Sequence, residues 1–169
     1  MRRRRQALPA HECVEILHTA TSGVLALVGA DGWPYAVPLN HAHDNGYLYF
    51  HCALSGRKVD AIRHCTKACF TVIAQDILVP EKYTSLYKSV MCFGRMYILE
   101  NEEERWHALH LIGERCNPGA DAAFAAEMQR NARRTLALRL DIEHMSGKEG
   151  IELARERRHD PTMSAYDDE

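Results

Sequence analysis

The segment His51-Cys52-Ala53-Leu54-Ser55-Gly56-Arg57-Lys58 holds the most concentrated set of chemically capable side chains in the chain. A strand-forming run precedes it and a helical pattern follows it, so it should lie where a strand gives way to a helix. Backbone N–H groups at a helix start attract anions, and a guanidinium with an ammonium group suits a phosphomonoester. The alternative is that Arg57 and Lys58 are solvated charges, and their spacing alone slightly favours that alternative.

Two groups of histidines and cysteines have spacings that could suit a metal ion. His107 and His110 stand three residues apart on a predicted helix, but no carboxylate or third ligand is obviously aligned with them. His64, Cys65 and Cys69 lack the second ligand pair of a structural zinc site. We therefore predict no metal site, and we assign no catalytic residue.

The elements that must position these groups follow from the apolar periodicity and the turn residues. Gly29-Ala30-Asp31-Gly32 and Asp44-Asn45-Gly46 supply turn chemistry, which predicts that the first three strands form an antiparallel meander. Pro80 and its polar neighbours predict a loop over 75–86. The predicted strands are 23–28, 35–43, 47–51, 69–74, 89–99 and 136–142, and the predicted helices are 10–20, 56–64, 102–116 and 122–133.

The last predicted strand has a period of two. Leu136, Leu138, Leu140 and Ile142 should point into the core, with the intervening residues on the other side. Gly94, inside the preceding strand, indicates a bulge or a close backbone approach. Six strands with few helices predict a mainly β fold, a closed or nearly closed antiparallel barrel.

Composition narrows the class of protein. A chain of 169 residues that is 46% apolar fits one domain. A net charge of −2 from 21 basic and 23 acidic residues argues against a nucleic-acid partner. No run approaches the roughly 20 apolar residues of a membrane span, so we predict no membrane association. The six cysteines, without a secretion signal, favour reduced thiols and a cytoplasmic location.

Several short segments, taken together, resemble the FMN-binding split-barrel superfamily of pyridoxamine 5′-phosphate oxidase. They are Val37-Pro38-Leu39-Asn40, Tyr49-Phe50-His51, Gly56-Arg57-Lys58, Ser89-Val90 and Gly94-Arg95. Within that superfamily the chain is most similar to the nitroimidazole-reductase-like branch, which is associated with nitroimidazole resistance. The resemblance covers residues 10–148 and implies an FMN-binding split-barrel domain with six antiparallel strands and flanking helices. The basic run Arg2–Arg5 predicts a solvated N-terminal tail (1–9), and residues 149–169 are predicted as a polar C-terminal tail.

The resemblance also implies a cofactor site shared by two chains of a homodimer. In the family, the strand matching Val37, Pro38, Leu39 and Asn40 lines the flavin ring. The segment matching His51, Cys52, Ser55, Arg57 and Lys58 holds the phosphate. The strand matching Ser89 and Val90 reaches the flavin of the other subunit. His51 and Cys52 stand where the oxidases carry small polar residues, and no set of substrate-phosphate arginines is found, which argues against vitamin B6 oxidation.

The function that the resemblance implies is an FMN-dependent oxidoreductase. It would pass electrons from NAD(P)H to a small electron-poor acceptor such as a nitroaromatic. The alternative is a non-catalytic protein that stores or senses FMN, or that holds haem through one of its ten histidines. Because a flavin carries the redox chemistry itself, the protein would contribute binding, orientation and exclusion of water.

Overall fold

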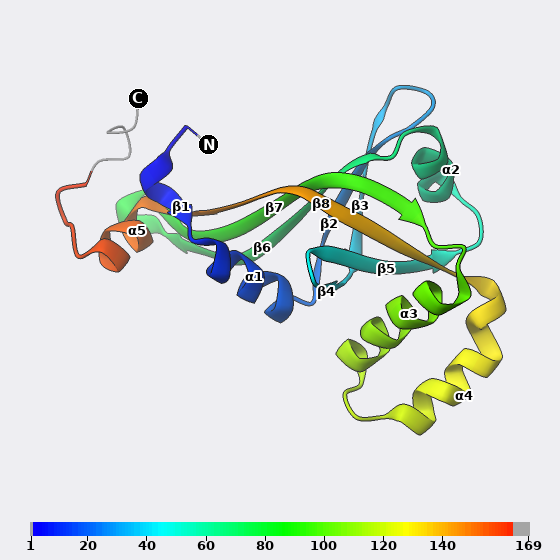
Figure 1. Ribbon diagram of the computed structural model, residues 1–169. Coiled ribbons are helices and arrows are strands. Elements are labelled where there is room, and N and C mark those ends of the chain that lie inside the picture. Colours follow the sequence, from blue (N-terminus) through cyan, green and yellow to red (C-terminus); the bar gives the residue numbers. More distant parts are fainter. Residues whose placement is uncertain (1, 164–169) are drawn as a thin grey trace. The chain divides into compact units, whose positions relative to one another are not determined.

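The computed structural model describes residues 2–163 of the chain (Figure 1). Its strands belong to one sheet with the order β3-β2-β6-β7-β8-β5-β4, and β1 pairs with β8. The helical elements are η1 (Arg4–Gln6), α1 (Ala10–Thr19), α2 (Arg57–His64), η2 (Pro80–Lys82), α3 (Glu102–Cys116), α4 (Asp121–Asn131), η3 (Ala132–Arg134) and α5 (Ile151–Arg158). The strands are β1 (Ala7–Leu8), β2 (Ser22–Val28), β3 (Pro34–Asn40), β4 (Ala42–Asp44), β5 (Tyr47–Ala53), β6 (Lys67–Val79), β7 (Thr84–Ile98) and β8 (Thr135–Glu149).

The chain divides into two compact units. The first comprises residues 2–20, 71–92 and 144–163, and the second comprises residues 21–70 and 93–143. The prediction of a mainly β fold with flanking helices is confirmed. Within residues 2–163 the sheet has eight strands rather than six, because the very short β1 and β4 join the six longer strands.

Two hairpins of the second unit form at the turns that the sequence predicts. Between β2 and β3, the Asp31 carboxylate accepts a hydrogen bond of 3.1 Å from the Trp33 N–H, and Gly32 has a φ of 78°. Between β4 and β5, Asn45 and Gly46 both have positive φ, 48° and 85°. Two successive left-handed residues match the twist of a tight hairpin, so Asn45-Gly46 is well suited to this place.

The predicted meander is wrong. β2 and β3 pair with each other, and β4 pairs with β5, but β3 and β5 are not neighbours in the strand order. The predicted strand 35–43 is in fact split at His41 into β3 and β4. The turn residues are local signals, whereas the choice of strand partner depends on residues far away in the sequence, here β8 for β5.

The second unit has a buried layer along the pair of β5 and β8. Phe50 lies opposite Leu138 and Leu48 lies opposite Leu140, and all four side chains are fully buried. Leu138 and Leu140 therefore alternate as predicted. Ala137, predicted to face the other side, is also fully buried, because α3 covers that side of the strand pair.

Helix α3 and part of α4 form a second apolar cluster over this strand pair. Tyr49 of β5 packs there with residues of α3, while Phe124 and Met128 of α4 contact the cluster from its margin. Asn101 caps α3, since its side chain accepts a hydrogen bond of 3.0 Å from the Glu104 N–H. The cluster contains Ala42, Tyr49, Leu99, Ala108, Leu109, Ile112 and Ala137.

Gly94 allows a close backbone approach, as the sequence predicts. A Cβ atom at this position would lie 1.9 Å from the carbonyl oxygen of Asp141 and 3.2 Å from the Glu143 nitrogen. Both are backbone atoms, so no side-chain movement could relieve the contact. A glycine is therefore required where β7 passes β8.

The segments predicted as tails carry structure within the first unit. Ala7 pairs with Lys148 in a short antiparallel ladder. Ala154 of α5 is fully buried, and Arg157 of α5 donates hydrogen bonds to the Glu149 carboxylate and to the Ala7 carbonyl, at 2.7 and 2.9 Å. A segment rich in charged residues is typical of a solvated tail, so the sequence does not reveal these contacts. Arginine can nevertheless donate hydrogen bonds to backbone carbonyls of the folded protein. Residues 164–169 of the predicted C-terminal tail lie outside the described residues.

The predicted loop over 75–86 is also wrong. β6 continues to Val79, and β7 begins at Thr84 after the single turn η2. Gln75 donates a side-chain hydrogen bond of 3.3 Å to the Leu86 carbonyl. Pairing of neighbouring strands here overrides the weak strand propensity of the polar residues.

Within residues 2–163, no helix combines the length and apolar character that crossing a membrane requires. None of the six cysteines forms a disulfide.

Candidate functional site

The N-terminus of α2 is open to a ligand. Gly56 precedes the helix with a φ of 130°, a conformation that favours glycine, and as the N-cap residue it has no side chain to cap the first turn. Val59, Ala61 and Ile62 are buried, which fixes the helix on the protein, and α2 packs against β2. The first backbone N–H groups of the helix are therefore available to an anion, as the sequence analysis proposes for this segment.

Arg57 is held against the β2–β3 hairpin. Its guanidinium lies 5.3 Å from the centre of the Tyr35 ring and 3.2 Å from a carboxylate oxygen of Asp31. The side chains of Arg57 and Asp31 are both 54% exposed, so this ion pair adds little to stability. The ion pair instead fixes the position of the Arg57 guanidinium, which it holds beside β3.

The predicted residues of β3 divide between two faces of the strand. Tyr35, Val37 and Leu39 alternate as half-buried residues, while Pro38 and Asn40 are exposed on the other face. Asn40 donates a side-chain hydrogen bond of 2.8 Å to the Thr21 carbonyl, which ties the end of β3 to the residue before β2. Arg57 thus lies over Tyr35, on the same strand face as Val37 and Leu39.

Lys58 acts electrostatically on the two unusual residues of the predicted segment. His51 keeps an exposed side, but partial desolvation and then the nearby Lys58 ammonium lower its pKa. Burial raises the pKa of the Cys52 thiol, and Lys58 opposes part of that rise. His51 is therefore held as a neutral imidazole, and Cys52 as a thiol. Ser55 lies exposed between them and α2.

His51 also lines an apolar cavity of about 370 Å³ under the α3–α4 pair. Neighbouring residues of β5 point to opposite faces, so His51 shares its face with Tyr49 and not with Cys52. The other walls come from α3, α4, η3 and the start of β8, and they include Leu109, Cys116, Phe124 and Met128.

Ser89 and Val90 belong to the first unit, on β7. Val90 is fully buried, so any contact that it makes with a ligand would be through its backbone. Ser89 is half-buried. Their contact with the flavin of a second subunit stays a prediction.

Two residues of the site escape the sequence analysis. Asp31 appears there only as a turn residue and Tyr35 only as a strand former, although both contact Arg57. Arg57 and Asp31 are 26 residues apart in the sequence, and a single sequence does not reveal that two such distant residues form an ion pair.

The sequence of the chain matches one protein family. The profile of the family described as pyridoxamine 5′-phosphate oxidase matches residues 9–149, which is most of the chain. The chain therefore belongs to this family, and the resemblance found in the sequence is confirmed. No curated protein matches the chain at a significant level.

Solved structures of the same fold come from several bacteria. A candidate 5-nitroimidazole antibiotic resistance protein of Bacteroides thetaiotaomicron is 24% identical over 85% of this chain and 86% of that chain, with a TM-score of 0.71. A FAD and haem binding protein of Mycobacterium smegmatis is 24% identical over 86% and 74%, with a TM-score of 0.73. A FAD-binding protein of Mesorhizobium loti is 28% identical over 85% and 96%, with a TM-score of 0.60.

Proposed function

We propose that the chain binds FMN and, as a homodimer, passes electrons from NAD(P)H to a small electron-poor acceptor such as a nitroaromatic. The observation that carries this proposal is the N-terminus of α2, where Arg57 lies over Tyr35 of β3 and Lys58 follows it in the first turn.

The phosphate of FMN fits the helix start. A phosphomonoester is close to a dianion at neutral pH, and it would accept hydrogen bonds from backbone N–H groups of the first turn, which the N-cap residue Gly56 has no side chain to cap. Arg57 supplies a planar pair of donors and Lys58 a mobile charge. Two cations at a helix start are electrostatically unfavourable, and Asp31 pairs only with Arg57, so a bound phosphate would add a favourable partner for both.

The flavin ring fits the neighbouring strand. Val37 and Leu39 offer a half-buried apolar surface, and Arg57 lies over Tyr35 of the same face. A flavin needs such an apolar slot for its ring together with a cationic end for its phosphate. The two ends of the proposed site thus come from segments that the fold brings together.

The homodimer is supported by two exposed aromatic side chains on one face of β7. Phe93 and Tyr97 are 43% and 40% exposed, with Arg95 between them on the same face, and Gly94 and Met96 of the other face are buried. A sheet face of this kind favours contact with a second surface. In the proposed dimer, Ser89 and Val90 of one chain approach the flavin bound at Arg57 and Lys58 of the other.

Flavin supplies the redox chemistry, and this chain supplies binding, orientation and exclusion of water. The likeness to a candidate nitroimidazole resistance protein supports a nitroaromatic acceptor. We also propose a cytoplasmic location, supported by six cysteines that form no disulfide.

A second candidate function is flavin or haem carriage without turnover. The cavity lined by His51 favours it, since the surroundings of His51 lower its pKa and keep the imidazole in the neutral form that ligates iron. A relative of the same fold is described as binding FAD and haem.

Titration of cofactor-free protein with FMN, FAD, riboflavin and haem tests these alternatives. The proposal predicts that FMN binds at one equivalent per chain and that riboflavin, which lacks the phosphate, binds at least tenfold more weakly, about 1.4 kcal/mol. Equal affinity for FMN and riboflavin would contradict the phosphate site. Turnover of NADH or NADPH with a panel of nitroaromatic acceptors then separates an enzyme from a carrier.

A further inference from the structure

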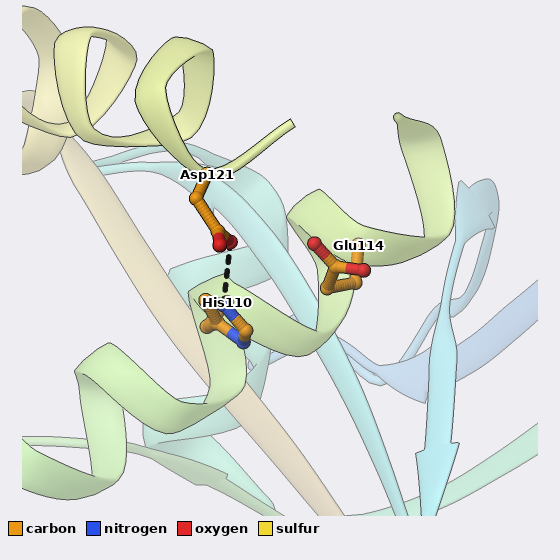
Figure 2. A group of neighbouring side chains, drawn as sticks. All are labelled: His110, Glu114 and Asp121. Carbon is orange, nitrogen blue, oxygen red and sulfur yellow. Dashed lines mark ion pairs between the residues drawn. The ribbon is translucent and has the colours of Figure 1, made fainter. Parts of the chain in front are cut away.

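A cluster of three possible metal ligands lies between α3 and α4. His110 and Glu114 stand one helical turn apart on α3, and Asp121 is the first residue of α4 (Figure 2). Each side chain offers one ligand atom, and these atoms all lie within 4.8 Å of one another. The prediction of no metal site overlooks Glu114, which stands four residues after His110 on the same helix, and the fold adds Asp121 from α4.

We propose that His110, Glu114 and Asp121 bind a divalent transition-metal ion, with Zn²⁺ as the natural occupant. Imidazole nitrogen and carboxylate oxygen are both zinc ligands, at about 2.0–2.1 Å, which places neighbouring ligands about 3.3 Å apart in a tetrahedral site. His110 Nε2 already lies 3.8 Å from Asp121 Oδ1. Asp121 is 86% exposed, so its side chain can move the remaining distance. Three protein ligands leave the fourth position for water or substrate.

The surroundings of the cluster support a cation. The His110 ring is stacked on Trp106, with centroids 5.0 Å apart and an interplanar angle of 14°, and its edge-on contact with Phe124 is 5.2 Å. These contacts orient the imidazole. Glu114 accepts a hydrogen bond of 3.2 Å from the Gly119 N–H, which holds its carboxylate near the α3–α4 turn. Such outer contacts typically orient the ligands of a metal site.

The charge around His110 is negative. A surface cavity of about 540 Å³ beside it is lined by Glu102, Glu103, Trp106 and His107 as well as by His110 itself. Together with the two carboxylate ligands, these glutamates favour a divalent cation over an anion. His107 serves another contact, since its Nε2 lies 3.4 Å from Asp44 Oδ2.

A bound ion would join the end of α3 to the start of α4. Because both helices line the cavity that contains His51, the ion would stabilise one wall of that cavity. Metal that binds only the folded protein raises the unfolding temperature, and the stabilisation grows with the logarithm of the ratio of free metal to the dissociation constant. Zn²⁺ binding at His110, Glu114 and Asp121 does not depend on flavin binding.

Titration with Zn²⁺ by calorimetry, and with Co²⁺ by absorption and Trp fluorescence, tests the site. The Trp33→Phe background leaves Trp106 as the single indole, since the chain has two. We expect one Zn²⁺ per chain, a rise in unfolding temperature, Co²⁺ ligand-field bands without thiolate charge transfer, and quenching of Trp106.

His110→Ala and Asp121→Asn should each weaken binding at least about tenfold. His107→Ala, one turn away on α3, is the matched control and should bind as the parent does. If His110→Ala fails to fold, Asp121→Asn still tests the site, because Asp121 is exposed and asparagine has nearly the same side-chain shape as aspartate. Unchanged Zn²⁺ affinity in Asp121→Asn, no saturable binding by the parent protein, or a thiolate charge-transfer band would overturn the proposal.

Discussion

The guanidinium of Arg57 lies 5.3 Å from the centre of the Tyr35 ring, and this contact joins the start of α2 to β3. It brings together two segments that the sequence suggests separately, one for a phosphate and one for a flavin ring. Asp31 holds the same guanidinium from the hairpin turn. The proposed cofactor site is therefore organised around Arg57.

The first prediction concerns the phosphate. Arg57→Ala combined with Lys58→Ala should weaken FMN binding at least tenfold, because each charge-assisted hydrogen bond contributes roughly 1.5–3 kcal/mol. Fluorescence titration measures the affinity. Arg63→Ala, an exposed cation in the last turn of the same helix, is the matched control and should change little. An unchanged affinity in the double variant would place the phosphate elsewhere.

The second prediction concerns the shared site. Mixing a subunit that carries Arg57→Ala and Lys58→Ala with a subunit that carries Ser89→Asp should restore about one intact site per mixed dimer. In a two-fold dimer, one site collects all the lesions and the other collects none. Native mass spectrometry identifies the mixed dimer, and bound FMN is counted in it. If such dimers form from folded variants but bind no FMN, the shared-site arrangement is wrong.

The third prediction concerns Gly94. Gly94→Ala should lower the free energy of unfolding by at least about 2 kcal/mol, because the new Cβ meets backbone atoms that cannot turn away. Arg95→Ala on the same strand should cost less than about 1 kcal/mol, since it removes only an exposed ion pair with Glu143. Urea unfolding of both variants decides between these outcomes, and equal stability of the two would refute the close approach.

The fourth prediction concerns pH. The pKa of His51 is lowered in the folded protein, so the unfolded chain binds more protons just below the ordinary imidazole pKa of about 6.5. Stability therefore rises with pH through this window and falls on acidification. His51→Gln should flatten this part of the stability profile, as measured by urea unfolding at a series of pH values. A profile of the variant that parallels the parent would show that His51 titrates normally.

Local chemistry in the sequence predicts much of this structure. Asn45-Gly46 predicts the β4–β5 hairpin, and Gly94 predicts the close approach of β7 to β8. The alternation of Leu138 and Leu140 predicts strand β8. Each of these features depends on short-range conformation or periodicity. The partner of β5 and the burial of Ala137 depend on distant segments and are not predictable in this way.

Some residues of the candidate site can be predicted from the sequence, and others cannot. Arg57 and Lys58 are visible as a motif, whereas Asp31 and Tyr35 become part of the site only through the fold. The cluster of His110, Glu114 and Asp121 likewise requires α4 to return beside α3.

FMN binding by this chain is tested most directly by the visible spectrum of the purified protein before and after addition of FMN, with the released cofactor identified by mass. We expect the two-band yellow spectrum of an oxidised flavin and recovery of FMN at one equivalent per chain. A Soret band without flavin, or no bound chromophore even after FMN is added, would contradict it.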